Sequence, residues 1–378
     1  FLLRDMTSKK IFLAISGSGD TFAWFRKDFF VELKNSGYRV IAMAPDISAN
    51  NLEELNQAGI EFNYFSLDRK SFNLLNLIFS IYKLQKIIRL INPDVIFSYM
   101  HKSIIVTSLA ARITKKNNLF SMITGLGHAF DDQTVKDKFI KLITISLLKV
   151  ALSNNKKVFF QNPDDSLLFI NKKIVRKEQV AQVNGSGVNL EKFPFSTPPS
   201  QPIFMTMARL LKSKGLIEFA EASKLMKELY PNARFLIYGY PDKHKDSIDE
   251  NEIKNIWPKR YGIEYMGFCS NPANEIAKSS VFVLLSYQEG TPRVALEALA
   301  IGRAVITTDA VGCRETVKNN HNGFLVKPKD HISSFKAMQK LMDYELRALM
   351  SKKSRILAEE KFDVKKINKV LINEMQIN

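Results

Sequence analysis

Cysteine is scarce in this chain, whose 378 residues include only Cys269 and Cys313. Two cysteines can build neither the disulfide framework of a small secreted protein nor a zinc knuckle. Long apolar runs are also missing, because stretches such as Leu74–Ile81 and Ile140–Leu148 contain polar residues, whereas a membrane-spanning helix needs roughly 18 apolar residues in succession. The N-terminus shows no apolar block followed by a small-residue cleavage site. We therefore expect a cytoplasmic protein without a secretory signal.

Acidic residues are outnumbered: 38 aspartates and glutamates stand against 55 lysines and arginines, which gives a formal net charge of +17. Such a charge attracts polyanions, which include nucleic acid, anionic lipid surfaces and phosphorylated substrates. A solvated, lysine-rich surface is the alternative. A nucleic-acid-binding module would interleave basic residues with exposed aromatic residues on one face. No such stripe is evident in the sequence, so we expect no nucleic acid partner.

Short apolar runs alternate with longer helical patterns along the whole chain. In the first half, the strand candidates are Ile11–Ser16, Val40–Ala44, Glu61–Phe65, Val95–Ser98, Leu119–Ile123 and Val158–Gln161. The helical candidates between them are Phe22–Ser36, Phe72–Ile91, Ser103–Lys115 and Val135–Leu152. The segment Phe193–Pro202 breaks this pattern, since Pro198, Pro199 and Pro202 fall within five positions. It is typical of a linker.

The same alternation restarts after the prolines. Here the strand candidates are Ile203–Met207, Arg234–Tyr238, Ile263–Met266, Val281–Leu285 and Ala304–Thr307. The helical candidates are Leu216–Tyr230, Pro292–Ile301, Ile332–Asp343, Tyr344–Lys361 and Val364–Met375. Strands that alternate with helices form parallel β-α-β units and an open, doubly wound sheet.

The sequence therefore predicts an α/β protein with two Rossmann-like domains that face each other across a cleft. We expect the first domain at residues 6–192, a linker at 193–202 and the second domain at 203–361. We expect the last helix, 362–378, to pack back on the first domain. Ligands of such sheets bind at the carboxyl ends of the strands, so those strand ends are the places to search for a site.

An acidic loop follows the strand candidate Val281–Leu285. Thr291 can cap the helix that begins near Pro292, and proline suits a first helical turn. The free N–H groups at that helix start, among them those near Gly290, suit an anion such as a phosphate. Glu289 lies in the loop and Glu297 lies about one and a half turns into the helix, so the two carboxylates could bind a sugar and a ribose. The alternative is a capping loop with Glu297 solvated.

Arg209 and Lys214 lie where the first strand of the second domain leads into a helix. Arginine binds phosphate bidentately and lysine acts as a mobile point charge, so the two suit a diphosphate; a solvated loop is the alternative. No Asp-x-Asp triplet, which would hold a divalent cation on a diphosphate, occurs in the chain. We therefore expect no metal and no cofactor, with Arg209, Lys214 and a helix terminus neutralising the diphosphate.

Glycines follow two strand candidates of the first domain. Gly17 and Gly19 resemble a dinucleotide fingerprint, but Phe22 stands where the third glycine belongs. We interpret them as a tight turn that lets a substrate or phosphate approach the backbone. Gly127 belongs to a second Gly-x-Gly and precedes His128, which we expect at the site.

His101 holds an analogous strand-end position in the first domain. It completes the set of candidate site residues in that domain.

These motifs resemble glycosyltransferase family 4, retaining enzymes with the two-domain GT-B architecture. The resemblance covers nearly the whole chain. It depends on the glycine turn at 17–19, His101-Lys-Ser, Gly125-Leu-Gly, Gly185-Ser-Gly187-Val-Asn-Leu-Glu-Lys-Phe193, Ala208-Arg…Lys214-Gly and Glu289-Gly-x-Pro-x-x-x-Leu-Glu297-Ala. Within the family, the chain is similar to bacterial enzymes that extend undecaprenyl-diphosphate-linked sugars, such as the N-acetylgalactosaminyltransferase of bacterial N-glycan assembly.

The resemblance implies roles for the matching residues of the second domain. Glu297 would hold the ribose hydroxyls and Glu289 the hydroxyls of the transferred sugar. Arg209 and Lys214 would bind the diphosphate and stabilise the leaving group. The turn Gly290–Pro292, which includes Thr291, would contact the donor through backbone amides.

The resemblance assigns the first domain to the acceptor. Gly17 and Gly19 would admit donor phosphate and acceptor, and His128 falls where members often place a histidine beside the donor sugar. His101 and Gly127 would line the substrate site.

The activity implied is transfer of an N-acetylhexosamine or hexose from a UDP-sugar to a polyprenyl-diphosphate-linked saccharide, in O-antigen, capsule or glycoprotein glycan assembly. The acceptor implies an anionic membrane surface as a partner and a peripheral position on the inner face of the cell membrane.

The stretch Val135–Ala151 could lie in that membrane interface, since Lys136, Lys138, Lys141 and Lys149 stand among Phe139, Ile140, Leu142, Leu147 and Leu148. A core-facing helix with a solvated lysine face is the alternative. Two further activities stay open at this point: a UDP-sugar 2-epimerase of the same fold and a nicotinamide-dependent oxidoreductase.

Overall fold

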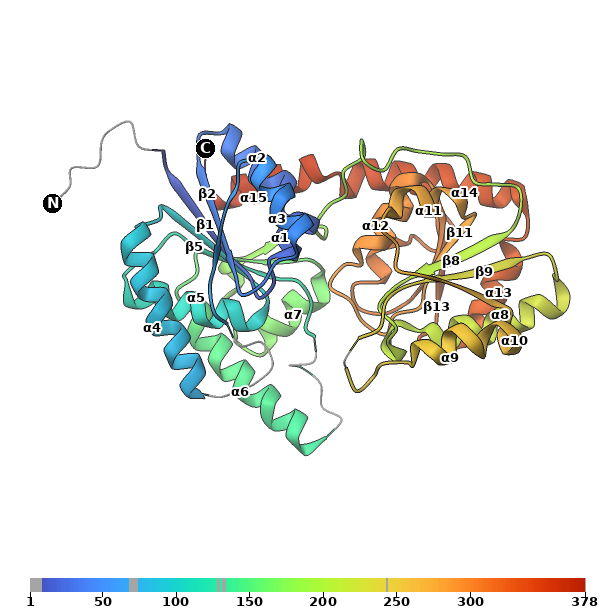
Figure 1. Ribbon diagram of the computed structural model, residues 1–378, viewed down its shortest axis with the longest axis horizontal. Helices are drawn as coiled ribbons and strands as arrows, with labels where there is room; N and C mark the ends of the chain where they lie inside the picture. Colours follow the sequence, from blue (N-terminus) through green and yellow to red (C-terminus); the bar gives the residue numbers. More distant parts are fainter. Residues whose placement is uncertain (1–8, 68–73, 128–129, 131–133, 243, 378) are drawn as a thin grey trace. The chain divides into compact units, whose positions relative to one another are not determined.

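The computed structural model describes residues 9–67, 74–127, 130, 134–242 and 244–377, and the chain forms two compact units (Figure 1). The first unit comprises the chain up to Ser186 together with Val364–Asn378, and the second comprises Gly187–Asp363. The proline-rich stretch 193–202, which we expected to be a linker, contains no helix or strand and belongs to the second unit.

The first unit contains a parallel sheet of seven strands in the order β3-β2-β1-β4-β5-β6-β7. The strands are β1 (Ile11–Ile15), β2 (Arg39–Ala44), β3 (Glu61–Tyr64), β4 (Val95–Tyr99), β5 (Leu119–Ile123), β6 (Lys157–Phe160) and β7 (Val180–Gln182). Helices cover both faces, so a central strand is apolar on each side. In β1, Leu13 and Ile15 enter one core, whereas Phe12 and Ala14 enter the other.

Two groups of helices cover this sheet (Figure 1). One core contains side chains of α4 (Leu74–Ile91), α5 (His101–Ile113), α6 (Val135–Leu152) and α7 (Pro163–Asn171). The opposite core contains side chains of α1 (Asp20–Phe25), α2 (Lys27–Asn35), α3 (Ala49–Gln57) and α15 (Val364–Met375). The last helix, α15, packs on the first unit through Ile367, Leu371 and Met375.

The continuous helix expected at Phe22–Ser36 is wrong. The chain forms α1 and α2 instead, with a break at Arg26, whose φ of −129° is not helical. The Arg26 side chain is buried, with its guanidinium over the ring of Tyr99 and one nitrogen 2.6 Å from the sulfur of Met122. These tertiary contacts of a buried cation accompany the break and outweigh the local helical pattern.

The second unit repeats the architecture with six parallel strands in the order β10-β9-β8-β11-β12-β13. The strands are β8 (Ile203–Met207), β9 (Arg234–Tyr238), β10 (Ile263–Gly267), β11 (Val281–Leu284), β12 (Ala304–Thr308) and β13 (Gly323–Val326). The helices are α8 (Leu216–Leu229), α9 (Glu250–Asn255), α10 (Trp257–Tyr261), α11 (Pro272–Lys278), α12 (Arg293–Ile301), α13 (His331–Lys340) and α14 (Tyr344–Leu357), which a π-helical turn continues through Phe362.

Both strand orders reverse direction beside the first strand of their sheet, as in the doubly wound Rossmann fold. The predicted α/β class with two Rossmann-like domains is therefore confirmed. In the part of the chain that the structure describes, no helix is both long and apolar enough to cross a membrane.

Candidate functional site

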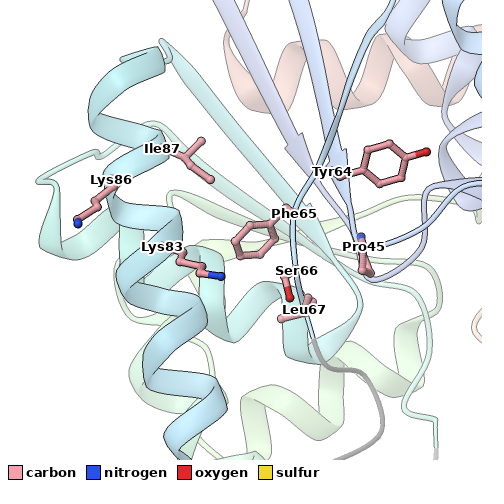
Figure 2. Close-up of a pocket in the computed structure, with 8 residues that line it drawn as sticks. All are labelled: Pro45, Tyr64, Phe65, Ser66, Leu67, Lys83, Lys86 and Ile87. Atoms are coloured by element: carbon pink, nitrogen blue, oxygen red, sulfur yellow. The ribbon is translucent and has the colours of Figure 1, made fainter.

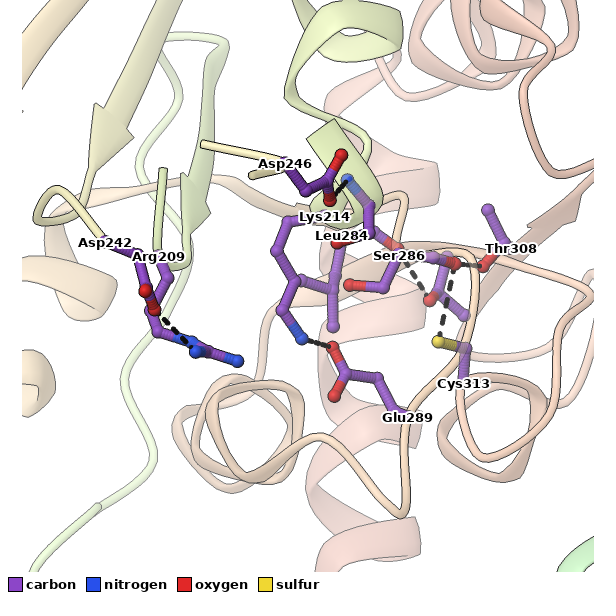
Figure 3. Close-up of polar contacts among 11 residues, drawn as sticks. Arg209, Lys214, Asp242, Asp246, Leu284, Ser286, Glu289, Thr308 and Cys313 are labelled. Atoms are coloured by element: carbon purple, nitrogen blue, oxygen red, sulfur yellow. Dashed lines mark hydrogen bonds and ion pairs between the residues drawn. The ribbon is translucent and has the colours of Figure 1, made fainter. Parts of the chain in front are cut away.

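Charged side chains gather at the carboxyl ends of the parallel strands in the second unit. The loops that carry those drawn in Figure 3 follow β8, β9 and β11. Since all strands of the sheet are parallel, the loops after neighbouring strands meet at one edge. That edge is where the sequence predicts the site, and two of the ion pairs there contain the predicted cations.

The first ion pair joins Lys214 to Glu289, which lie 75 residues apart in the chain. Their side chains are only 17% and 19% exposed. Lys214 ends a short 3₁₀ turn, and the following Gly215 has a left-handed φ of +71°. A Cβ at Gly215 would lie 2.1 Å from the carbonyl oxygen of Leu285, so only glycine allows the loop after β8 to lie this close to the end of β11.

The loop that carries Glu289 is fixed from the side of β12. The Glu289 N–H donates to the carbonyl of Val311 at 3.0 Å. Gly312 has a φ of +75°, and a Cβ there would lie 2.2 Å from the carbonyl oxygen of Glu289. The Ser286 carbonyl accepts hydrogen bonds from the Thr308 hydroxyl and the Cys313 thiol. The backbone around Glu289 is therefore held before any ligand enters.

The second ion pair joins Arg209 to Asp242, with 2.6 Å between a guanidinium nitrogen and Oδ2. Partial burial acts to raise the pKa of Asp242, but the hydrogen bond and charge of Arg209 leave it below its ordinary value. The same loop after β8 is tied down by Asp246, whose Oδ2 accepts the Ser213 N–H at 2.8 Å. Both predicted cations are thus at the strand ends, and each is engaged by a carboxylate.

The helix that follows the acidic loop begins one residue later than predicted. Its first residue is Arg293, and Pro292 occupies the N-cap position. The hydroxyl of Thr291 donates to the carbonyl of Gly290 at 2.9 Å, so the predicted cap by Thr291 is wrong. A proline at the cap has no hydroxyl, and the helix lacks a side-chain cap bond there.

Glu297 is not solvated. Its carboxylate pairs with Arg293 one turn earlier at 3.0 Å, and the side chain is only 13% exposed. Burial raises the pKa of Glu297, and the charge of Arg293 offsets part of that rise. A second Arg293 nitrogen donates to the Gly187 carbonyl at 2.6 Å. Glu297 therefore forms an ion pair of its own, distinct from the Lys214–Glu289 pair, and the alternative of a solvated Glu297 is wrong.

In the first unit, the glycine turn follows β1, and both Gly17 and Gly19 are buried. The Gly19 N–H donates to the carbonyl of Asp46 at 2.8 Å, and a Cβ at Gly19 would lie only 2.4 Å from that oxygen. The space beside Gly19 is therefore filled by the protein's own backbone. The predicted close approach of a substrate at Gly19 is wrong, and the glycine joins the loops after β1 and β2.

His101 is the first residue of α5, at the carboxyl end of β4. Its Nε2 is buried and has no hydrogen-bond partner within the described residues, and its ring lies 5.3 Å from that of Phe130. Burial lowers the pKa of His101 to about 4, so the imidazole is neutral at pH 7. Gly127 has a left-handed φ of +57° with open space where a Cβ would lie. His128 lies outside the described residues.

Three residues of the second-unit site were missed by the sequence reasoning: Asp242, Asp246 and Arg293. Arg293 could have been found, since it precedes Glu297 by four residues and such pairs lie on one helix face. Asp242 and Asp246 follow β9 in a loop whose path has no local signal. No group of three histidine, cysteine or acidic side chains that could hold a metal ion occurs among the residues that the structure describes.

Comparison with known proteins matches both halves of the chain to glycosyl transferase families. The model described as "Glycosyl transferase 4-like" matches residues 11–162, and the model "Glycosyl transferases group 1" matches residues 189–357. Each family model falls within one structural unit. Since both describe glycosyl transferases, neither the epimerase nor the oxidoreductase interpretation is favoured.

Two curated relatives align with most of the chain. The N,N'-diacetylbacillosaminyl-diphospho-undecaprenol alpha-1,3-N-acetylgalactosaminyltransferase of Campylobacter jejuni is 27% identical over 330 residues, which cover 84% of this chain and 85% of that protein. The Escherichia coli UDP-Gal:alpha-D-GlcNAc-diphosphoundecaprenol alpha-1,3-galactosyltransferase is 26% identical over 316 residues, which cover 79% and 80%.

Among solved structures, Anabaena HepE in complex with UDP and glucose superposes with a TM-score of 0.74 at 17% identity, covering 98% of this chain and 100% of HepE. At this identity, the superposition shows a common fold.

Proposed function

The chain is a glycosyltransferase with the GT-B fold, and we propose that it moves an N-acetylhexosamine or a hexose from a UDP-sugar to a saccharide linked to polyprenyl diphosphate, with retention. One observation supports the donor half of this proposal, which is the binding of the UDP-sugar by the second unit. Lys214, paired with Glu289, lies at one strand edge with Arg209, and Glu297 follows on the helix that starts there. These are the charges and acceptors that a nucleoside diphosphate sugar requires.

The acceptor and the stereochemistry are proposed from the relatives. Both curated relatives are named for diphosphoundecaprenol acceptors and alpha-1,3 linkages. UDP-hexoses carry their sugar in an α linkage, so an α-linked product corresponds to retention. The same relatives support a place in the assembly of a lipid-linked glycan, such as an O-antigen, a capsule or a glycoprotein glycan.

Each residue at the second-unit edge has a proposed task in transfer. Arg209 and Lys214 exchange their carboxylate partners for the diphosphate and stabilise the charge that grows on it as the glycosidic bond breaks. Glu289, released from Lys214, accepts hydrogen bonds from hydroxyls of the sugar. Glu297 accepts hydrogen bonds from the ribose hydroxyls. The amides of the Gly290–Pro292 turn contact the donor.

UDP binding by a Glu297→Ala variant tests the donor half. We expect about a 10- to 100-fold weaker UDP affinity, because a hydrogen bond to a charged group contributes about 1.5–3 kcal/mol. Glu359→Ala is the matched control, since Glu359 pairs with Arg355 at the same spacing. Isothermal titration measures both affinities, and a thermal scan checks folding. A Glu297→Ala variant that binds UDP normally would remove the ribose role.

The titrations are carried out in EDTA. Wild-type affinity is expected to persist there, because we propose that Arg209 and Lys214 neutralise the diphosphate without a divalent cation. Loss of UDP binding in EDTA would contradict this metal independence.

We also propose that α6 contacts an anionic membrane surface. Phe139 and Leu142 are 63% and 62% exposed on this helix, beside the exposed Lys138 and the half-buried Lys141. Leu148 is fully buried, so its expected place in the membrane interface is wrong and it belongs to the core. The remaining pattern combines apolar and basic side chains on one helix, as peripheral membrane helices do.

Charge reversal on α6 tests the membrane role. Lys138→Glu with Lys141→Glu is expected to weaken binding to phosphatidylserine-containing vesicles by at least about 10-fold, since a lysine near such a surface contributes about 1 kcal/mol. Lys172→Glu with Lys177→Glu is the control, because both lysines are exposed elsewhere on the first unit. Vesicle sedimentation measures the binding, and unchanged sedimentation of the α6 variant would rule the role out.

A further inference from the structure

An open groove of about 720 Å³ lies in the first unit, between α4 and the chain that leaves β3 (Figure 2). This volume is in the range of small-molecule sites. The groove lies at the carboxyl ends of β2 and β3. Ligands of parallel sheets bind at this edge, which also carries the loops of Gly19 and His101. None of the site residues predicted from the sequence lines the groove.

The lining of the groove is mainly apolar. Phe65 and Leu67 are buried side chains that form one wall, and Ile87 of α4 faces them across the opening (Figure 2). Among the described residues of the lining, the uncharged polar side-chain groups are the hydroxyls of Ser66 and Tyr64. A free sugar or a nucleobase needs several hydrogen-bond partners, which such a lining does not supply.

Two lysines complete the groove. Lys83 extends from α4 toward Ser66, whereas Lys86 lies one turn further and leads away along the rim (Figure 2). Each ammonium lies 4.3 Å from the centre of an aromatic ring, Lys83 over Phe79 and Lys86 over Tyr82. Within the described residues, neither has a carboxylate partner. The helix α4 carries three cations and no acidic residue.

An apolar stripe continues from the groove along α4. Ile78, Phe79 and Tyr82 are exposed, at spacings that place them on one face of the helix. A ligand with a long apolar chain could therefore extend out of the groove without losing contact with apolar side chains. The chemistry favours an amphiphile that has an anionic end and an apolar body.

We propose that this groove binds the lipid end of the acceptor, an isoprenyl diphosphate. The isoprenoid packs on Phe65, Leu67 and Ile87. The ammonium groups of Lys83 and Lys86 leave their aromatic rings and form ion pairs with the phosphate oxygens. The inference rests on the proposed function, since it assigns the acceptor's lipid to a place on the first unit.

Farnesyl diphosphate, a short isoprenyl diphosphate, serves as the probe, with the full chain in saturating UDP so that the nucleotide site is occupied. The wild-type chain is expected to bind it, and Lys83→Ala with Lys86→Ala to weaken binding at least 10-fold. Lys172→Ala with Lys177→Ala, at exposed positions outside the groove, is expected to bind within twofold of wild type. Farnesol and inorganic diphosphate alone are each expected to bind at least 10-fold more weakly than farnesyl diphosphate.

Three results would overturn the inference. The first is that the Lys83→Ala, Lys86→Ala variant binds farnesyl diphosphate with the same affinity as the wild-type chain. The second is that the wild-type chain binds inorganic diphosphate as tightly as farnesyl diphosphate, which would indicate an anion site without a role for the isoprenoid. The third is that the Lys83→Ala, Lys86→Ala variant no longer binds anionic vesicles but still binds farnesyl diphosphate, which would assign the lysines to the membrane surface. A UDP titration separates this outcome from the proposed function: a chain that binds UDP but fails the farnesyl test refutes the groove alone, and a chain that does not bind UDP refutes the donor half.

Discussion

The two units have the same strand order around their first strands, yet they place different side chains at the carboxyl edge of the sheet. The second unit places ion pairs there, which include Arg209–Asp242 and Lys214–Glu289. The first unit places a packed glycine turn, a neutral buried histidine and an apolar groove with lysines at its rim. A common fold therefore does not fix the ligand. We propose that the edge loops bind a hydrophilic anion in the second unit and an amphiphile in the first.

The largest effect expected from this difference is that of Lys214→Met. Removing a charge that stabilises the transition state is expected to lower the rate of sugar transfer by about 100- to 1000-fold. Farnesyl diphosphate binding should stay unchanged, because that contact is assigned to the first unit. Lys212→Met, two residues earlier in the same turn and exposed, is the matched control. A transfer rate within threefold of wild type would break the assignment of diphosphate chemistry to the second unit.

Paired glycine substitutions give a smaller effect and sharpen the comparison. Gly19→Ala and Gly312→Ala each force a Cβ against a backbone oxygen, at 2.4 and 2.2 Å. Each is expected to lower the free energy of unfolding by about 1–3 kcal/mol. Only Gly312→Ala should also weaken UDP binding, because Gly312 touches the backbone of Glu289. Denaturant titrations measure the stability of the two variants, and UDP titrations measure their affinity. Equal UDP affinities of the Gly19→Ala and Gly312→Ala variants would show that the Glu289 loop does not contribute to donor binding.

The smallest effect concerns the pH dependence of the first unit. Burial lowers the pKa of His101 to about 4 from an ordinary 6.5. Its contribution to stability is therefore fully present above pH 6.5 and is lost as the pH falls toward 4. At pH 5 the loss is about 1–2 kcal/mol. Relative to His101→Gln, the wild type should thus lose stability between pH 7 and pH 5 in denaturant titrations. Parallel pH curves for the two proteins would contradict a buried, neutral imidazole.

Most of the fold could be predicted from the sequence, because the central strands are short apolar runs between helical patterns. Strands β1, β5 and β8 were each predicted within one residue. The missed strands, β7 and β13, are edge strands of only three and four residues, too short to show an apolar pattern of their own. The helix α3 was missed because Leu55 is its only buried residue, so it has almost no apolar periodicity.

The site could be predicted less completely. Lys214 and Glu289 both follow strands, and the rule that parallel strand ends share an edge predicts that they lie near one another. Their pairing, and that of Arg209 with Asp242, depends on side-chain geometry that no local pattern encodes. The groove on α4 was missed for a similar reason, because Phe65 and Lys83 come together only when β3 and α4 pack.

The course of the chain has a consequence for biosynthesis. The second unit is one continuous segment, whose two ends are held together by the hydrogen bond from the Val188 N–H to the Phe362 carbonyl at 2.7 Å. The first unit lacks Ile367, Leu371 and Met375 until α15, which follows the second unit in the chain, has been made. During translation, the second unit can therefore reach its final fold first, while the first unit waits with an uncovered apolar face. Synthesis of α15 completes the unit that was begun first.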